Sequence, residues 1–96
     1  MSRKKYEITE AAHPKYPWLH RIRAICQVNE QVSPGMLGGY VQTEDNLSQE
    51  GTCWIYDQAV CCEEAAVADD GRMFDGAVAR GSALVGGDAR MFERAM

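Results

Sequence analysis

Residues 53–94 read CWIYDQ–AVCCEE–AAVADD–GRMFDG–AVARGS–ALVGGD–ARMFER, which is seven consecutive blocks of six residues. The first position of every block is small, the third is apolar, and the fifth is aspartate, glutamate or glycine. A six-residue period fits neither an α-helix nor an ordinary series of hairpins. It predicts short parallel strands separated by bends, with the small and apolar positions both turned inward.

Three blocks should complete one triangular coil, so residues 18 apart would stack at the ordinary strand spacing of about 4.8 Å. The acids and glycines at the fifth position suit bends that need an unusual φ. Looser copies of the pattern reach back to Val41, which gives about three coils, near the minimum for a continuous core. Within this pattern Cys53 and Cys61 point inward as small apolar residues, and Cys62 points outward.

The first part of the chain differs in composition. Residues 1–38 hold all three prolines and two strand-like runs, 5–9 and 19–25, which predict a hairpin with a long, proline-containing connection. We therefore expect an N-terminal strand or hairpin cap over 1–38 and a repeat region over 39–96, together one compact domain. Six basic and three acidic residues give the cap a charge of +3, whereas four arginines and eleven acids give the repeats −7.

Composition excludes several classes of protein. With 46% hydrophobic and 25% charged residues, the chain is in the globular range. No apolar run reaches the length of a membrane span, and the basic N-terminus leads into acidic rather than apolar sequence, so neither a membrane segment nor a secretory signal is expected. The adjacent pair Cys61–Cys62 argues against a disulfide scaffold. We expect a cytoplasmic protein.

The repeats resemble the hexapeptide-repeat proteins, in which an aliphatic residue is followed four positions later by a small one. Ile55/Ala59, Val67/Gly71 and Val85/Ala89 follow that pattern. The resemblance implies an all-β fold, a left-handed parallel β-helix of about three short coils with an N-terminal hairpin-like cap. More narrowly, the segments 37–41, 46–51 and 53–56 resemble uncharacterised members encoded by bacteriophages and prophages, in which N-terminal strands cap the helix.

Stacking at 18 residues produces outward columns of aromatic and basic side chains. The structural interpretation is a ladder of stacked side chains that stiffens the coils. The functional interpretation is an exposed stripe that binds another protein. Val60, Val78 and Met96 form a further apolar column that favours the second. The candidate interface residues are Trp54, Tyr56, Arg72, Phe74, Arg90 and Phe92.

Carboxylates form further columns that could engage a host protein with a basic surface. The alternative is a solvated face that contributes only solubility. The same acids disfavour direct nucleic-acid binding by the repeats. The candidate acidic residues are Asp57, Glu63, Glu64, Asp69, Asp70, Asp75, Asp88 and Glu93.

Catalysis finds less support in the residues. Many hexapeptide-repeat proteins are acyltransferases with a histidine base, but His13 and His20 both lie in the cap. We read His13 as a turn residue and His20 as a surface or cap-packing residue. No cysteine or histidine pair has zinc-ligand spacing, and the glycines of 81–87 follow the repeat and form no phosphate loop. We expect no catalytic residue, metal or cofactor.

The leading hypothesis is therefore a non-enzymatic phage-type binding protein, for example an inhibitor of a host defence complex. A hexapeptide-type acyltransferase, or a degenerate relative of one, is the alternative, and a structural assembly module is the second alternative. Because the repeats stop at Met96 without a capping segment, we also expect self-association, as a homodimer or alternatively a trimer.

Overall fold

The computed structural model describes residues 4–92, and these form an all-β chain with one short 3-10 helix. The strands of the cap are much longer than those of the repeats, which have two residues each. In chain order the elements are β1 (Tyr6–Ala12), β2 (His20–Ala24), β3 (Leu37–Val41), η1 (Glu44–Asn46), β4 (Trp54–Ile55), β5 (Val60–Cys61), β6 (Ala66–Val67), β7 (Arg72–Met73), β8 (Val78–Ala79), β9 (Leu84–Val85) and β10 (Arg90–Met91).

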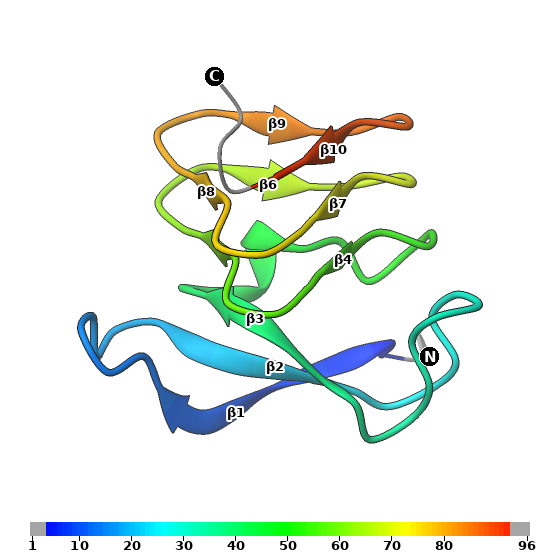
Figure 1. Ribbon diagram of the computed structural model, residues 1–96, viewed down its shortest axis with the longest axis horizontal. Helices are drawn as coiled ribbons and strands as arrows, with labels where there is room; N and C mark the ends of the chain where they lie inside the picture. The colour runs from blue at the N-terminus through cyan, green and yellow to red at the C-terminus, as the bar shows by residue number, and fades with distance from the viewer. Residues whose placement is uncertain (1–3, 93–96) are drawn as a thin grey trace.

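Strands β4–β10 wind into stacked coils above the cap (Figure 1). Three parallel ladders result: β4–β7–β10, β5–β8 and β6–β9. Trp54 pairs with Arg72, which pairs with Arg90, so each coil advances by 18 residues. The predicted stacking is therefore confirmed for β4–β10, with backbone bonds between coils such as Tyr56 N to Met73 O at 2.8 Å.

The bends follow the predicted rhythm. The fifth position of each of the first six blocks has a positive φ, between 55° and 68°, at Asp57, Glu63, Asp69, Asp75, Gly81 and Gly87. This left-handed conformation costs least for glycine, and aspartate tolerates it better than most side chains. Backbone geometry thus explains the aspartates and glycines at this position.

The inward positions form one core. The apolar third positions are buried from Ile55 to Val85, and so are the small first positions from Cys53 to Ala77. Ala83 and Ala89, which were also predicted to face inward, are exposed because they belong to the last coil that the structure describes. Burying these side chains is the main favourable contribution to the fold.

The first coil is two residues longer than the others. Val41 pairs with Cys61 and Leu47 with Val67, an offset of 20 residues instead of 18. The two extra residues lie between Leu47 and Ile55, which are eight positions apart, whereas their partners Val67 and Met73 are six apart. At the preceding corner, formed by η1, buried Asn46 accepts hydrogen bonds from the backbone N–H groups of residues 42 and 43. Its amide donates to Ala65 O at 2.8 Å, so one side chain replaces backbone pairing at the irregular corner.

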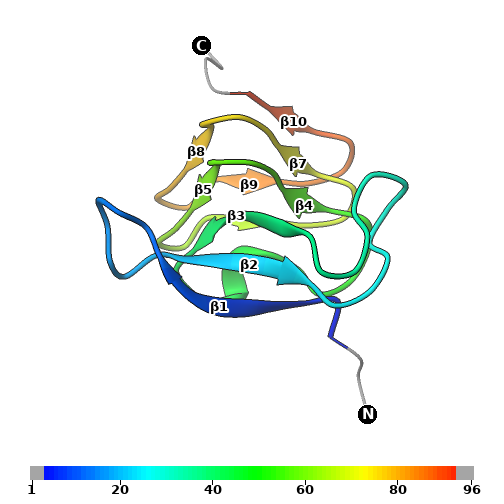
Figure 2. The ribbon, with the colours of Figure 1, turned by 60° about the horizontal axis from the view of Figure 1, so that its bottom comes forward.

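The cap is the antiparallel hairpin expected from the sequence, although β1 runs further than predicted, to Ala12. Strand β3 pairs with β2 on one side, antiparallel, and with β5 on the other, parallel. This makes one mixed sheet in the order β1–β2–β3–β5–β8, and Figure 2 shows β1 and β2 lying across the end of the coil. β3 also runs through the boundary expected at residues 38/39. A Cβ on Gly38 would lie 2.6 Å from Ile55 O, so the close approach of β3 requires glycine there.

Candidate functional site

The predicted aromatic column exists as a stack. The rings of Tyr56 and Phe74 lie 4.7 Å apart at 10°, and those of Phe74 and Phe92 lie 4.9 Å apart at 13°. At its lower end Tyr56 Oη accepts from Asn29 Nδ2 and donates to Gln31 Oε1, both on the cap. Within this column only Phe92, which is 50% exposed, offers a large free ring surface. The rings of Tyr56 and Phe74 are largely covered by stacking on their neighbours and are not available to a partner.

The expected column of Trp54, Arg72 and Arg90 exists, because these residues pair with one another from coil to coil, but its first two members are buried and not exposed. Trp54 is 1% exposed because the cap covers it, with the Tyr6 ring packed edge-on at 6.2 Å. Arg72 is also buried, and its guanidinium pairs with Asp70 at 3.1 Å and with Glu30 of the cap at 3.6 Å. Only Arg90 is exposed, so these residues do not form a shared binding face.

The carboxylates are distributed over all three corners of the coil. Several of them hold the fold together: Glu63 accepts from Gly81 N at 2.7 Å, and Asp69 accepts from Gly87 N at 3.1 Å, each bridging to the coil above. Asp70 accepts from Thr52 and Arg72, which holds the pKa of its carboxyl below the usual range, Thr52 contributing most. Asp57, Glu64, Asp75 and Asp88 are solvated, and Glu93 lies outside the described residues.

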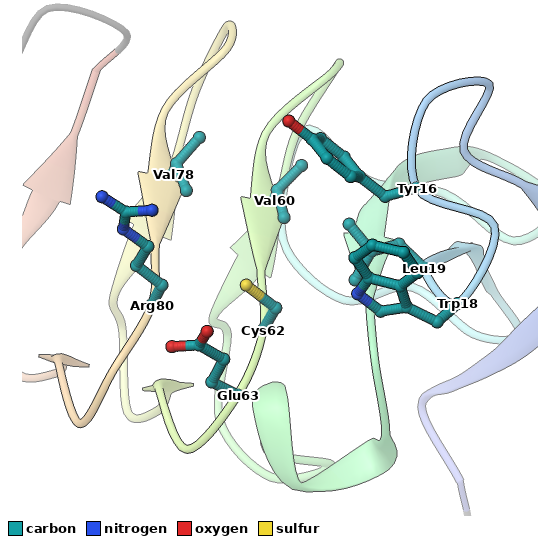
Figure 3. Close-up of a pocket in the computed structure, with 8 residues that line it drawn as sticks. All are labelled: Tyr16, Trp18, Leu19, Val60, Cys62, Glu63, Val78 and Arg80. Carbon is teal, nitrogen blue, oxygen red and sulfur yellow. The ribbon is translucent and has the colours of Figure 1, made fainter.

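A groove of about 530 Å³ opens between the cap and the face formed by β5 and β8 (Figure 3). Tyr16 and Trp18 of the cap form one wall, opposite the stacked Val60 and Val78. Trp18 is 56% exposed and Val78 48% exposed. The remaining lining residues are Leu19, Cys62, Glu63 and Arg80.

The aromatic wall is held in place by the connection that carries it. His13 N donates to Leu19 O at 2.8 Å, and Leu19 N donates to Tyr16 O at 2.9 Å, which closes the segment. His13 Nδ1 accepts from Lys15 N at 3.0 Å and from Tyr16 N at 3.3 Å, in the turn role expected for it. The His13 ring also packs on Tyr40 at 4.6 Å, so the wall is preformed.

The sequence indicated one side of this groove and missed the other. Val60 and Val78 had been assigned to an outward apolar column, and Val78 is exposed, whereas Val60 is buried at the base of the groove. Tyr16 and Trp18 carry no periodic signal. Two aromatics on either side of Pro17 in a short connection were the available clue.

Polar chemistry in the groove is limited. Burial raises the pKa of the Cys62 thiol above its ordinary value of 9.0, and Glu63 adds to the rise. A protonated thiol is a weak nucleophile. Within residues 4–92 there is no group of three or more His, Cys, Asp or Glu side chains that could hold a metal ion. That part of the chain also has no helix long and apolar enough to cross a membrane.

Comparison with known proteins gives a partial similarity. No family model matches the sequence. A stretch of 56 residues, 57% of this chain, is 39% identical to part of the Escherichia coli (strain K12) protein named uncharacterized acetyltransferase YdcK. The stretch covers 17% of that protein.

Proposed function

We propose that this chain is a non-enzymatic binding protein and that the groove between the cap and the β5–β8 face receives a partner protein. The exposed Trp18 beside Val78 is the observation that carries the proposal. Tryptophan, tyrosine and arginine are the residues that most often dominate binding energy at interfaces, and all three line this groove. Its wall is preformed, so little ordering entropy opposes binding.

The partner in this proposal has a basic surface with an apolar side chain that enters the groove. Residues 39–96 carry a charge of −7, and Glu64 beside the rim is solvated. The negative charge of the repeats attracts a basic protein, and added salt shortens the distance over which this attraction acts. Inhibition of a host defence complex by a phage-encoded protein is one form of this proposal, and it rests on the sequence resemblance alone.

The test is capture of proteins from a bacterial lysate by the immobilised chain and by two matched variants. Trp18→Ala should weaken retention of a specific partner about thirtyfold, which corresponds to about 2 kcal/mol. Phe92→Ala removes a comparably exposed ring outside the groove and should leave retention unchanged. Affinity should also fall as salt rises from about 0.1 M to about 1 M. A partner that the Trp18→Ala and Phe92→Ala variants retain equally well would contradict the proposal. So would a partner whose affinity does not change with salt concentration.

The alternative function is acyl transfer, as in a hexapeptide-type acyltransferase or a degenerate relative. The similarity to a protein named as an acetyltransferase favours it. Against it, two backbone N–H groups donate to His13 Nδ1, so the neutral ring carries its proton on Nε2 and has no free lone pair to act as a base. Calorimetry with acetyl coenzyme A separates the two functions, because micromolar binding would favour the transferase.

We further propose that the coil is the left-handed parallel β-helix of hexapeptide-repeat proteins. The two-residue strands, the 18-residue advance and the positive φ at the bends from Asp57 to Gly87 support this assignment. A crystal structure would test it through the handedness of the coil.

Self-association as a homodimer, or alternatively a trimer, is proposed as well. Leu84, which is 70% exposed, and Phe92 are apolar surfaces that a second copy could cover. Light scattering at micromolar concentration tests this proposal, and the mass of a single chain would overturn it.

A further inference from the structure

A buried lysine and a buried cysteine are in contact at the lower end of the coil. Lys5 Nζ lies 3.2 Å from Cys53 Sγ, although the two residues are 48 positions apart in the chain. Cys53 is fully buried and Lys5 is only 5% exposed. The binding groove uses neither side chain.

The surroundings fix this contact. The ammonium donates to Cys53 O at 3.0 Å and to the carbonyls of Glu50 and Gly51 at 3.3 Å. The sulfur in turn lies 3.6–3.7 Å from three carbonyl oxygens, that of Glu50 again and those of Ser48 and Val67. The Lys5 ammonium has three N–H groups but four acceptors around it, the three carbonyls and the Cys53 sulfur. The carbonyls therefore position the nitrogen beside the sulfur, and no N–H group has to be committed to the sulfur alone.

We propose that Lys5 and Cys53 form a modification site, at which a peroxide joins them through an N–O–S bridge. In the first step the Cys53 sulfur takes one oxygen from hydrogen peroxide, giving sulfenic acid and water, and sulfur loses two electrons. Lys5 reacts as the neutral amine, so its ammonium first releases one proton to water. In the second step a second peroxide accepts two electrons from the Lys5 nitrogen. One N–H bond and the O–H bond of the sulfenic acid break, an N–O bond forms, and two waters leave.

The geometry favours this bridge over other products. In the bridge, the N–O and O–S bonds separate the Lys5 nitrogen from the Cys53 sulfur by slightly less than the 3.2 Å of the observed contact. The two side chains therefore need to move little. A direct S–N bond would require a much closer approach of two groups that the surrounding carbonyls hold in place. All four cysteines are free thiols, and the sulfur has the amine as a nearby reaction partner. Glu50 and Gly51, whose carbonyls accept from Lys5, are exposed, and local opening of this bend would admit peroxide to the pair.

The bridge would tie the start of the cap to the coil, because Lys5 immediately precedes β1 and Cys53 immediately precedes β4. A covalent link between distant positions restricts the unfolded chain, as a disulfide does. The oxidised protein should therefore melt at a higher temperature than the reduced protein.

The experiment is hydrogen peroxide treatment of the folded, full-length chain, followed by intact mass measurement and peptide mapping. We expect a gain of one oxygen and a loss of two hydrogens, joined peptides containing Lys5 and Cys53, and loss of tryptic cleavage after Lys5. Dithiothreitol should reverse all three changes. Cys61→Ser, which removes another buried thiol, should retain the product, whereas Lys5→Arg and Cys53→Ser should lose both the product and the rise in melting temperature.

Mapping of the unsubstituted chain decides the proposal even where a variant does not fold. Oxygen added to Cys53 without loss of hydrogen would overturn the bridge. A disulfide to another cysteine, or an unmodified Lys5–Cys53 pair after treatment, would overturn it equally.

Discussion

Cys61 is a residue whose ionisation the fold opposes. Its thiol lies inside the coil, 3.3 Å from Asn46 O, and burial raises its pKa from 9.0 to about 12. Burial, followed by the charge of Glu44, also raises the pKa of Tyr6 above its ordinary value. The fold therefore favours the protonated forms of two side chains that titrate in alkali.

The resulting prediction concerns stability at high pH. A folded-state pKa above the unfolded one stabilises the protein fully below pH 9.0, and this contribution is lost as pH rises toward about 12. The melting temperature should fall over that interval, and Cys61→Ala should make the fall shallower. Val67→Ala, which removes buried apolar volume from the same core and no ionisable group, should leave the slope unchanged. Equal slopes for all three proteins in a thermal titration would show that Cys61 is not responsible.

Gly71 shows why one block begins with glycine where most others begin with alanine. A Cβ at this position would collide with the carbonyl of Val85, whose carbon would be only 2.8 Å away. Gly71→Ala should therefore lower the free energy of unfolding by about 1–3 kcal/mol. Gly86→Ala is the matched control, because its Cβ would meet nothing closer than 3.4 Å. Denaturant melts measure both, and a Gly71→Ala protein as stable as the control would mean that the coils are less closely spaced.

At the scale of elements, the aromatic stack predicts unequal effects along one column. Phe74 contacts a ring on each side, whereas Phe92 contacts one and is half exposed. Phe74→Ala should cost about 2–3 kcal/mol of stability and Phe92→Ala about 1 kcal/mol. Urea denaturation of the two variants provides the measurement. Equal losses would indicate that the rings contribute individually and not as a stack.

The repeat elements could be predicted from the sequence because their determinants are local and periodic. The residues that form the bend and the residues that face inward lie at fixed positions within each six-residue block. The coil is the repetition of that block. The two additional residues between Leu47 and Ile55 could not be predicted, since they precede the seven regular blocks and become evident only from the pairing of Leu47 with Val67 and of Ile55 with Met73. The extension of β1 to Ala12 likewise follows from pairing with β2 and not from its own composition.

At the scale of the whole molecule, the errors come from contacts between the cap and the coil. Trp54 and Arg72 occupy outward positions in their blocks, yet Tyr6 and Glu30 cover them from elsewhere in the chain. The groove arises in the same way, because Trp18 of the cap lies opposite Val78 of the coil. Periodicity specifies the direction of a side chain, but it does not specify what lies over it.

These contacts predict that the cap and the coil unfold as one cooperative unit. Cap residues such as Tyr6 and Ile22 share a single buried cluster with Ile55, Met73 and the other inward residues of the coil. β3 adds backbone bonds to both parts. In a Trp18→Phe background the remaining tryptophan, Trp54, reports on the cap–coil contact by fluorescence, while circular dichroism reports on the strands.

The two probes should give the same denaturation midpoint, and Tyr6→Ala should shift both by the same amount. This substitution removes a fully buried ring, so the shift should correspond to about 3–5 kcal/mol. Ile25→Ala, at a side chain that is 47% exposed, is the control and should move neither midpoint appreciably. If Tyr6→Ala shifted the fluorescence transition and left the dichroism transition in place, the coil would be stable without its cap, and burial of Trp54 would be incidental to the fold.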